Sequence, residues 1–131
     1  MIFFYNSNGD LIKKSIDKVH QGSNRANKIW LFVPYEKAVV TVAYRLPNGT
    51  VLPESIMTKG EYTKKLDFNC EGFFSWYIDI TSMVTAHSGD VVVQFYIKTI
   101  DGESCELATQ AVCFSVTSGV APKIDPLIIG G

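Results

Sequence analysis

The chain has 131 residues, of which 47% are hydrophobic and 19% are charged, and its formal net charge at pH 7 is −1. This composition is typical of one folded domain and excludes an intrinsically disordered chain. Twelve Lys and Arg residues stand against thirteen Asp and Glu residues without forming a long basic run, so we expect no nucleic-acid partner.

The N-terminal run Met1–Tyr5 is apolar, but it is short and lacks both a basic flank and a small-residue cleavage site, so it does not match a signal peptide. No segment approaches the ~18 consecutive apolar residues that a membrane-spanning helix needs, so we expect no membrane insertion. The three cysteines, Cys70, Cys105 and Cys113, form no Cys-x-x-Cys pair and indicate neither a disulfide framework nor a zinc site.

The first part of the chain predicts a hairpin and a buried strand. Short apolar runs at Ile2–Tyr5 and Leu11–Ile16 flank a turn-rich stretch at 6–10, which indicates an N-terminal hairpin that forms a flap or an edge pair. After a polar segment with a bend at Gly22, the residues Lys28–Pro34 predict a strand that is apolar on both faces.

The middle of the chain alternates with the period of a β-strand. Even positions of Val39–Leu46 form one apolar face, and the tip Pro47-Asn48-Gly49 predicts a hairpin. Further strands are predicted at Lys65–Cys70 and at Phe73–Ile80. The second of these has the most hydrophobic face, which we place in the core: Phe74, Trp76, Ile78 and Ile80.

The C-terminal part predicts one helical turn and two long strands. Thr81–His87 could form the turn, and Asp90–Ile100 follows as a strand. Asp101-Gly102 is a second hairpin signal, after which Cys105–Val116 returns. One face of the strand at Asp90–Ile100 is apolar, and the other carries Val92, Gln94, Tyr96 and Lys98.

Together these elements predict an all-β domain. We expect a two-layer antiparallel β-sandwich of jelly-roll or immunoglobulin-like type, with at most one short helical turn, over residues 1–118. Residues 119–131 are rich in Gly and Pro and are typical of a linker or of the start of a following segment.

The residue types needed for catalysis form no recognisable pattern. His20 and His87 are far apart, no metal-binding spacing occurs, and His87-Ser88-Gly89-Asp90 cannot align a catalytic triad within one turn. Carboxylates fall at strand ends or outward positions, and the Gly-containing tips are hairpins rather than phosphate loops. We therefore expect no enzyme activity, no metal ion and no cofactor.

Aromatic residues are the informative excess, with eight Phe, six Tyr and two Trp. Some of them fall on strand faces opposite the predicted core, and such rings need cover by the termini of the chain, by a protein partner or by a sugar. These are our candidate interface or ligand-facing residues: Trp30, Phe32, Phe73, Tyr77 and Tyr96.

A family resemblance rests on the segment from Val19 to Gly49. The loop Val19-His20-Gln21-Gly22-Ser23-Asn24 precedes Ala26-Asn27-Lys28-Ile29, and Val39-Val40-Thr41-Val42-Ala43-Tyr44 leads into Leu46-Pro47-Asn48-Gly49. This arrangement resembles the N-terminal domain of phage baseplate upper proteins and related tail-fibre proteins from phages of Gram-positive bacteria. In organisation the resemblance extends over residues 1–118.

The resemblance implies a virion structural module that docks a baseplate or tail-fibre protein to the tail baseplate as part of the host-adsorption apparatus. It implies synthesis in the bacterial host cytoplasm, other baseplate or tail proteins as partners, and a homo-oligomer in the full-length protein. Two other classes stay open. One is a carbohydrate-binding module that uses Trp30, Tyr77 or Tyr96 on a host-surface glycan, and the other is a small bacterial adhesion domain, against which the lack of a secretion signal counts.

Overall fold

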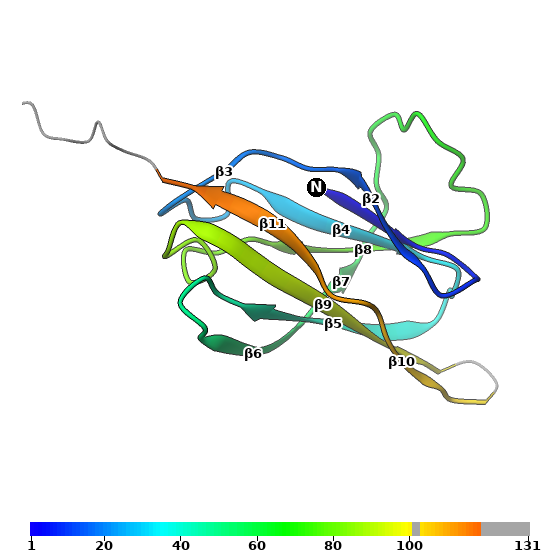
Figure 1. The fold of residues 1–131 in the computed structure, drawn as a ribbon. Helices are drawn as coiled ribbons and strands as arrows, with labels where there is room; N and C mark the ends of the chain where they lie inside the picture. The colour runs from blue at the N-terminus through cyan, green and yellow to red at the C-terminus, as the bar shows by residue number, and fades with distance from the viewer. Residues whose placement is uncertain (101–102, 119–131) are drawn as a thin grey trace, which may run out of the picture.

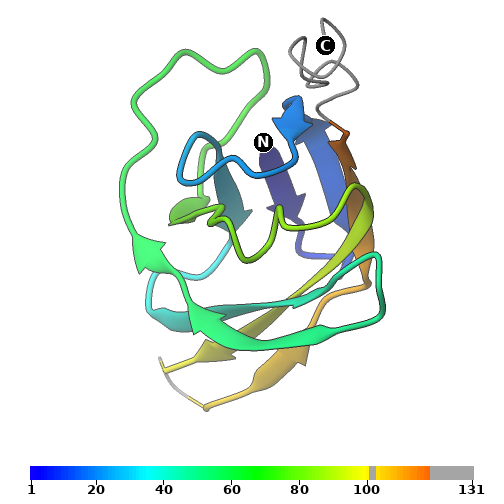
Figure 2. The same cartoon turned by 90° about the vertical axis from the view of Figure 1, so that its left-hand side faces the viewer.

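The computed structural model describes residues 1–100 and 103–118. In these residues the ordered elements are β-strands, which form two sheets that lie face to face (Figures 1 and 2). The sandwich is not closed into a barrel. The prediction of an all-β two-layer sandwich is confirmed. The predicted hairpin tip at Asp101-Gly102 and the predicted linker at 119–131 lie outside the described residues.

Sheet A contains the N-terminal hairpin. Its strand order is β2 (Leu11–Ser15), β1 (Ile2–Tyr5), β4 (Lys28–Val33), β8 (Phe74–Asp79) and β7 (Thr58–Lys59). The turn between β1 and β2 closes through Asn6, whose side-chain oxygen accepts bonds from the backbone N–H groups of Asn8 and Asp10. The predicted hairpin is confirmed, with β2 at the edge of the sheet.

Sheet B contains the long strands of the second half. Its order is β3 (Val19–His20), β11 (Val112–Thr117), β9 (Gly89–Thr99), β5 (Ala38–Arg45) and β6 (Val51–Ile56), and β10 (Glu106–Ala108) also pairs with β9. Strands β5 and β6 form the predicted hairpin, in which Gly49 adopts a positive φ of 90° that an L side chain rarely allows.

The core lies between the sheets, as the alternation predicted. Even positions of β5 and odd positions of β9 face inward, and they meet β1, β4 and β8 from the opposite side. The rings of Phe3 and Phe95 touch across the two sheets with centroids 5.6 Å apart. The predicted core face of Phe73–Ile80 is confirmed, because Trp76 and Ile80 are buried and Phe74 and Ile78 pack against them. Val42, Val93, Phe95 and Phe114 are buried in the same core.

Two pairings are parallel, although the sequence predicted an antiparallel sandwich. Strand β4 runs parallel to β1, and β3 runs parallel to β11. The hairpin partner β2 already occupies the other side of β1. The chain then contributes β3 to sheet B, and it returns to sheet A through the polar segment 21–27 before β4 joins β1.

Two local predictions need correction. The segment Lys65–Cys70 is not a strand, because its apolar residues cover the outside of sheet A instead of joining a ladder. Thr81–His87 forms only turns, as its shortness predicted, with Val84 N–H donating to the Thr81 carbonyl. The predicted strand Cys105–Val116 is split into β10 and β11 because the side-chain oxygen of Thr109 replaces a backbone acceptor for Phe95 N–H.

Substituting Trp76 tests the core. The indole is 2% exposed, so we expect Trp76→Ala to lower the free energy of unfolding by about 3–5 kcal/mol through lost burial and a cavity. Val51→Ala on the exposed side of β6 is the matched control and should stay within about 0.5 kcal/mol. Urea unfolding followed by circular dichroism measures both, and equal midpoints for the two variants would contradict the core assignment.

Candidate functional site

Four of the five candidate aromatics gather on the outer face of sheet A. Trp30 and Phe32 point outward from β4, Tyr77 lies beside Trp30 on β8, and Phe73 precedes β8. The long loop 60–73, drawn in green in Figure 1, returns over this face. We call this group, with Ile2 and Phe4 of β1 and with Tyr62, Leu66, Phe68 and Cys70 of the loop, the aromatic cluster.

Phe4 is the centre of the aromatic cluster. Its ring stacks on Phe32 with centroids 4.9 Å apart, and Phe68 and Phe73 meet it edge-on at 4.7 and 4.8 Å. Lys14 places its ammonium 5.2 Å from the centre of the Phe68 ring, on the solvent side. Phe32 is only 4% exposed under this cover.

Trp30 occupies the margin of the cluster. It is half-buried between Tyr62 of the loop and Tyr77 of β8, at centroid distances of 4.9 and 5.0 Å. The loop begins at Gly60, where a Cβ atom would lie 2.7 Å from the Tyr77 ring, so the ring and the start of the loop fit only without a side chain there.

Cover for Trp30 and Phe32 comes from the loop 60–73, which is none of the three sources considered from the sequence: the termini, a partner and a sugar. Strand β1 lies beside β4 in the same sheet. The face is therefore an internal packing layer, and Phe32 is not open to a partner.

Opening the aromatic cluster should be measurable. We expect Phe68→Ser to lower the free energy of unfolding by about 1–2 kcal/mol, because the ring is half-buried, and to increase the fluorescence of a hydrophobic dye as Phe4 and Phe32 become exposed. The matched control is Asp67→Ser, which changes an exposed neighbour in the same loop. Unchanged stability and dye binding in Phe68→Ser would contradict the covering role of the loop.

Tyr96, the fifth candidate, lies apart from the others. It belongs to β9 in sheet B, on the face turned away from the core, and it is 36% exposed. Tyr96 thus lies opposite the core side of its strand, as predicted, but in the other sheet from Phe73 and Tyr77. Its hydroxyl donates to Oε1 of Gln94 at 3.1 Å, and Gln94 Nε2 donates to the Thr109 carbonyl at 2.8 Å. The ring is thus tied down along its own strand.

A hollow of about 460 Å³ lies beside Tyr96 on the outer face of sheet B. We call it the β9 trough. Two cross-strand rows form its floor: Thr41, Tyr96 and Ala108 in one row, and Val39, Lys98 and Glu106 in the next. Glu54 joins from β6 and accepts a bond from the Thr41 hydroxyl at 2.5 Å. The trough therefore combines one exposed ring with several hydrogen-bonding side chains.

A larger hollow of about 620 Å³ opens between β6 and β8, at the side of the sandwich. We call it the edge hollow. Leu52, Pro53, Ile78, Met83 and Val84 give it apolar walls, and Arg25 and Asp79 stand among its lining residues. It exists because β7 has only two residues and pairs with β8 only at Trp76 and Tyr77, so the next part of β8 has no strand between it and β6.

Tyr44 also lines the edge hollow. The residue is 4% exposed, and within the described part of the chain its hydroxyl has no hydrogen-bond partner. Burial raises the pKa of Tyr44 well above its usual range, so the phenol stays protonated and can act as a donor.

Ion pairs fix the chain around Asp79. Lys28 Nζ lies 2.6 Å from Oδ1 and Arg25 Nη2 lies 3.0 Å from Oδ2 of this carboxylate. Arg25 reaches it from a left-handed backbone conformation with φ of 63°, in which its N–H donates to the Ile80 carbonyl. The hydrogen bond from Lys28, aided by Arg25, lowers the pKa of Asp79.

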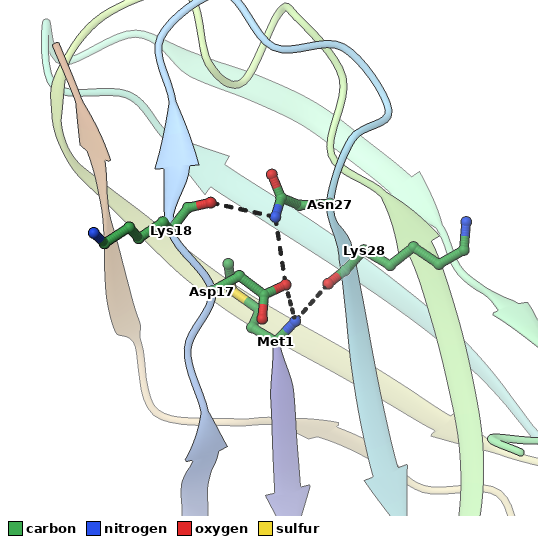
Figure 3. Close-up of polar contacts among 5 residues, drawn as sticks. All are labelled: Met1, Asp17, Lys18, Asn27 and Lys28. Carbon is green, nitrogen blue, oxygen red and sulfur yellow. Dashed lines mark hydrogen bonds and ion pairs between the residues drawn. The ribbon is translucent and has the colours of Figure 1, made fainter. Parts of the chain in front are cut away.

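The α-amino group of Met1 is held at the same end of sheet A (Figure 3). It donates to Asp17 Oδ2 at 2.9 Å and to the Lys28 carbonyl at 2.8 Å, and Asn27 Nδ2 also reaches Asp17 at 3.4 Å. These bonds join β1 to the start of β4 and to the segment before β3. We regard them as structural, because both acceptors act to position the backbone.

The Asp79 contacts predict a pH dependence. The folded-state pKa is lowered, so the stabilisation is complete above the ordinary carboxyl value of about 3.9 and is lost as the pH falls through the folded-state pKa. We expect Asp79→Asn to be less stable than wild type at pH 7 and the difference to shrink below about pH 4. Thermal melts at several pH values measure this, with exposed Glu61→Gln as the control. A stability difference that stays constant down to pH 2 would contradict it.

The two histidines make separate contacts. His20 Nδ1 lies 3.1 Å from the Thr117 hydroxyl and links β3 to β11, whereas His87 Nε2 lies 3.2 Å from Asn48 Nδ2 at the tip between β5 and β6. Among residues 1–100 and 103–118 no group of three His, Cys, Asp or Glu side chains could hold a metal ion. The same part of the chain has no helix that is long and apolar enough to cross a membrane.

Neither a scan against models of protein families nor a search of curated proteins gave a match.

Sequence reasoning found part of the β9 trough and missed the edge hollow. Period-2 alternation placed Gln94, Tyr96 and Lys98 on one face of β9, which the structure confirms. Glu54 and Glu106 were missed because they reach the trough through pairing across strands. The edge hollow was missed because it depends on the shortness of β7, for which the sequence carries no signal that we could identify.

Proposed function

We propose that this domain is a docking module of a phage tail, which attaches a baseplate or tail-fibre protein to the baseplate. The resemblance in Val19–Gly49 suggests the assembly, and the edge hollow supports a place for a partner. We propose the virion as its location after synthesis in the bacterial host cytoplasm, and we assign it no reaction and no cofactor.

The observation that carries the docking proposal is the exposure of apolar side chains around β6. Ile56 of β6 is 68% exposed, and Met83 beside the edge hollow is 63% exposed. Among the described strands β6 is last in its sheet, so its outer edge has no strand neighbour. Large apolar groups beside an unpaired edge are typical of a surface that a partner covers.

The geometry favours one kind of occupant, an extended segment of a neighbouring tail protein. A segment lying along β6 could place an apolar side chain into the edge hollow, against Leu52 and Met83. Pro53 in β6 lacks an N–H group, which limits indiscriminate pairing with other strands. Specificity would then come from the shape of the hollow and from the charged pair Arg25 and Asp79 beside it.

The docking proposal predicts a separation of assembly from stability. We expect Met83→Asp to change the melting temperature little, because the side chain is exposed, and to prevent incorporation of the protein into tails. The assay is complementation of the phage that carries the gene, with mass spectrometry of purified tails. Ile16→Asp changes an apolar residue that is 48% exposed in the loop between β2 and β3, and it is the matched control.

A photo-crosslinking residue at Ile56 should in addition join the domain to one defined tail protein. Tails that incorporate Met83→Asp normally and give no crosslink from position 56 would contradict docking through β6. Purified tails that lack the wild-type protein would contradict the virion assignment.

A further inference from the structure

Tyr96 stands between two hollows on the outer face of sheet B. The β9 trough lies on one side of it, and a smaller hollow of about 230 Å³, also lined by Gln94, Ala43 and Arg45, lies on the other. The open surface is therefore elongated, with an aromatic ring near its middle. This shape suits a chain-like ligand that passes over the ring.

The orientation of the Tyr96 ring is fixed by hydrogen bonds. Its hydroxyl bonds to Gln94, two residues earlier on the same face of β9, so the ring leans along the strand instead of rotating in solvent. Gln94 is itself held by the Thr109 carbonyl. An exposed aromatic ring that is already fixed loses little conformational entropy when a ligand covers it.

The groups around the ring select the chemistry of the ligand. Glu54 and Glu106 supply carboxylate oxygens, and Lys98, 3.7 Å from Glu106, supplies a single ammonium. Within the β9 trough two acids stand against one base, and Arg45 in the smaller hollow brings the whole surface to two acids and two bases. The surface therefore has no excess of positive charge for phosphates and other polyanions, whereas carboxylates accept hydrogen bonds well from hydroxyl groups. The ligand should therefore have an apolar face for Tyr96 and hydroxyl groups at its edges.

We propose that the β9 trough binds a neutral oligosaccharide. A sugar ring stacks its C–H face on Tyr96, and its hydroxyl groups donate to Glu54 and Glu106. The β9 trough and the smaller hollow lie on opposite sides of Tyr96, so neighbouring sugar units of the chain occupy the two hollows. This site is separate from the edge hollow, and it stands whether or not the docking proposal is correct.

The test uses the full 131-residue chain on a printed array of neutral and acidic oligosaccharides, followed by calorimetric titration of the neutral oligosaccharide that is retained best. We expect Tyr96→Ala to weaken its binding at least about tenfold, and Tyr96→Phe, which keeps the ring, to stay within about threefold of wild type. Glu54→Gln should weaken binding as well, because a carboxylate acceptor is lost.

Met83→Asp is the control that separates the two proposals, and it should bind the sugar as wild type does. Circular dichroism melts establish that each variant is folded. Three outcomes would overturn the proposal: no neutral oligosaccharide retained by wild type, an affinity unchanged in Tyr96→Ala, or retention of acidic sugars alone with loss of binding at high salt.

Discussion

Strand β4 imposes the constraint on which the rest of the domain depends, because it is apolar on both faces. One face of β4 is covered by sheet B, which fully buries Ile29, Leu31 and Val33. Phe32 and Trp30 face the opposite way and require a second layer. A strand in an ordinary two-layer sandwich has one wet face, so this sheet needs an additional segment. The loop 60–73 provides it.

The second cover on sheet A determines which surface stays open. The loop uses fourteen positions of the chain, from 60 to 73, and these pack on sheet A through Leu66, Phe68 and Phe73. The outer face of sheet B has no comparable cover among the described residues, and its side chains, such as Val39 and Tyr96, are exposed. The β9 trough therefore falls on sheet B, away from the face that is richest in aromatic residues, whereas the edge hollow lies between β6 and β8 and has Tyr77 in its lining.

The sequence was informative where structure depends on neighbours along the chain. Alternation in Val39–Leu46 and in Asp90–Ile100 predicted which side chains are buried, because a strand sends successive residues to opposite faces. The same signal misled at Lys65–Cys70. Leu66, Phe68 and Cys70 do share a side, but alternation shows only that they face one way and does not show whether the backbone pairs with a strand.

Non-local choices could not be predicted. The parallel direction of β4 relative to β1 depends on where the chain crosses between the sheets after β3. We found no single residue in the segment 21–27 that predicts this crossover. Tyr77 and Tyr96 each lie opposite the core positions of their own strand, yet β8 and β9 belong to different sheets. The same holds for the β9 trough. Alternation within β9 predicts that Tyr96 faces outward, but Glu54 and Glu106 reach the trough only through pairing with other strands, which alternation does not predict.

Strand β6 borders both proposed surfaces, and this makes them neighbours with distinct chemistry. Leu52 of β6 lines the edge hollow, whereas Glu54 lines the β9 trough and is held there by Thr41 of β5. A segment docked along β6 would restrain this edge strand, and Glu54 with it, without covering Tyr96 on β9. Because edge strands are held from one side only, such restraint would reduce the entropy that a sugar must remove from the trough.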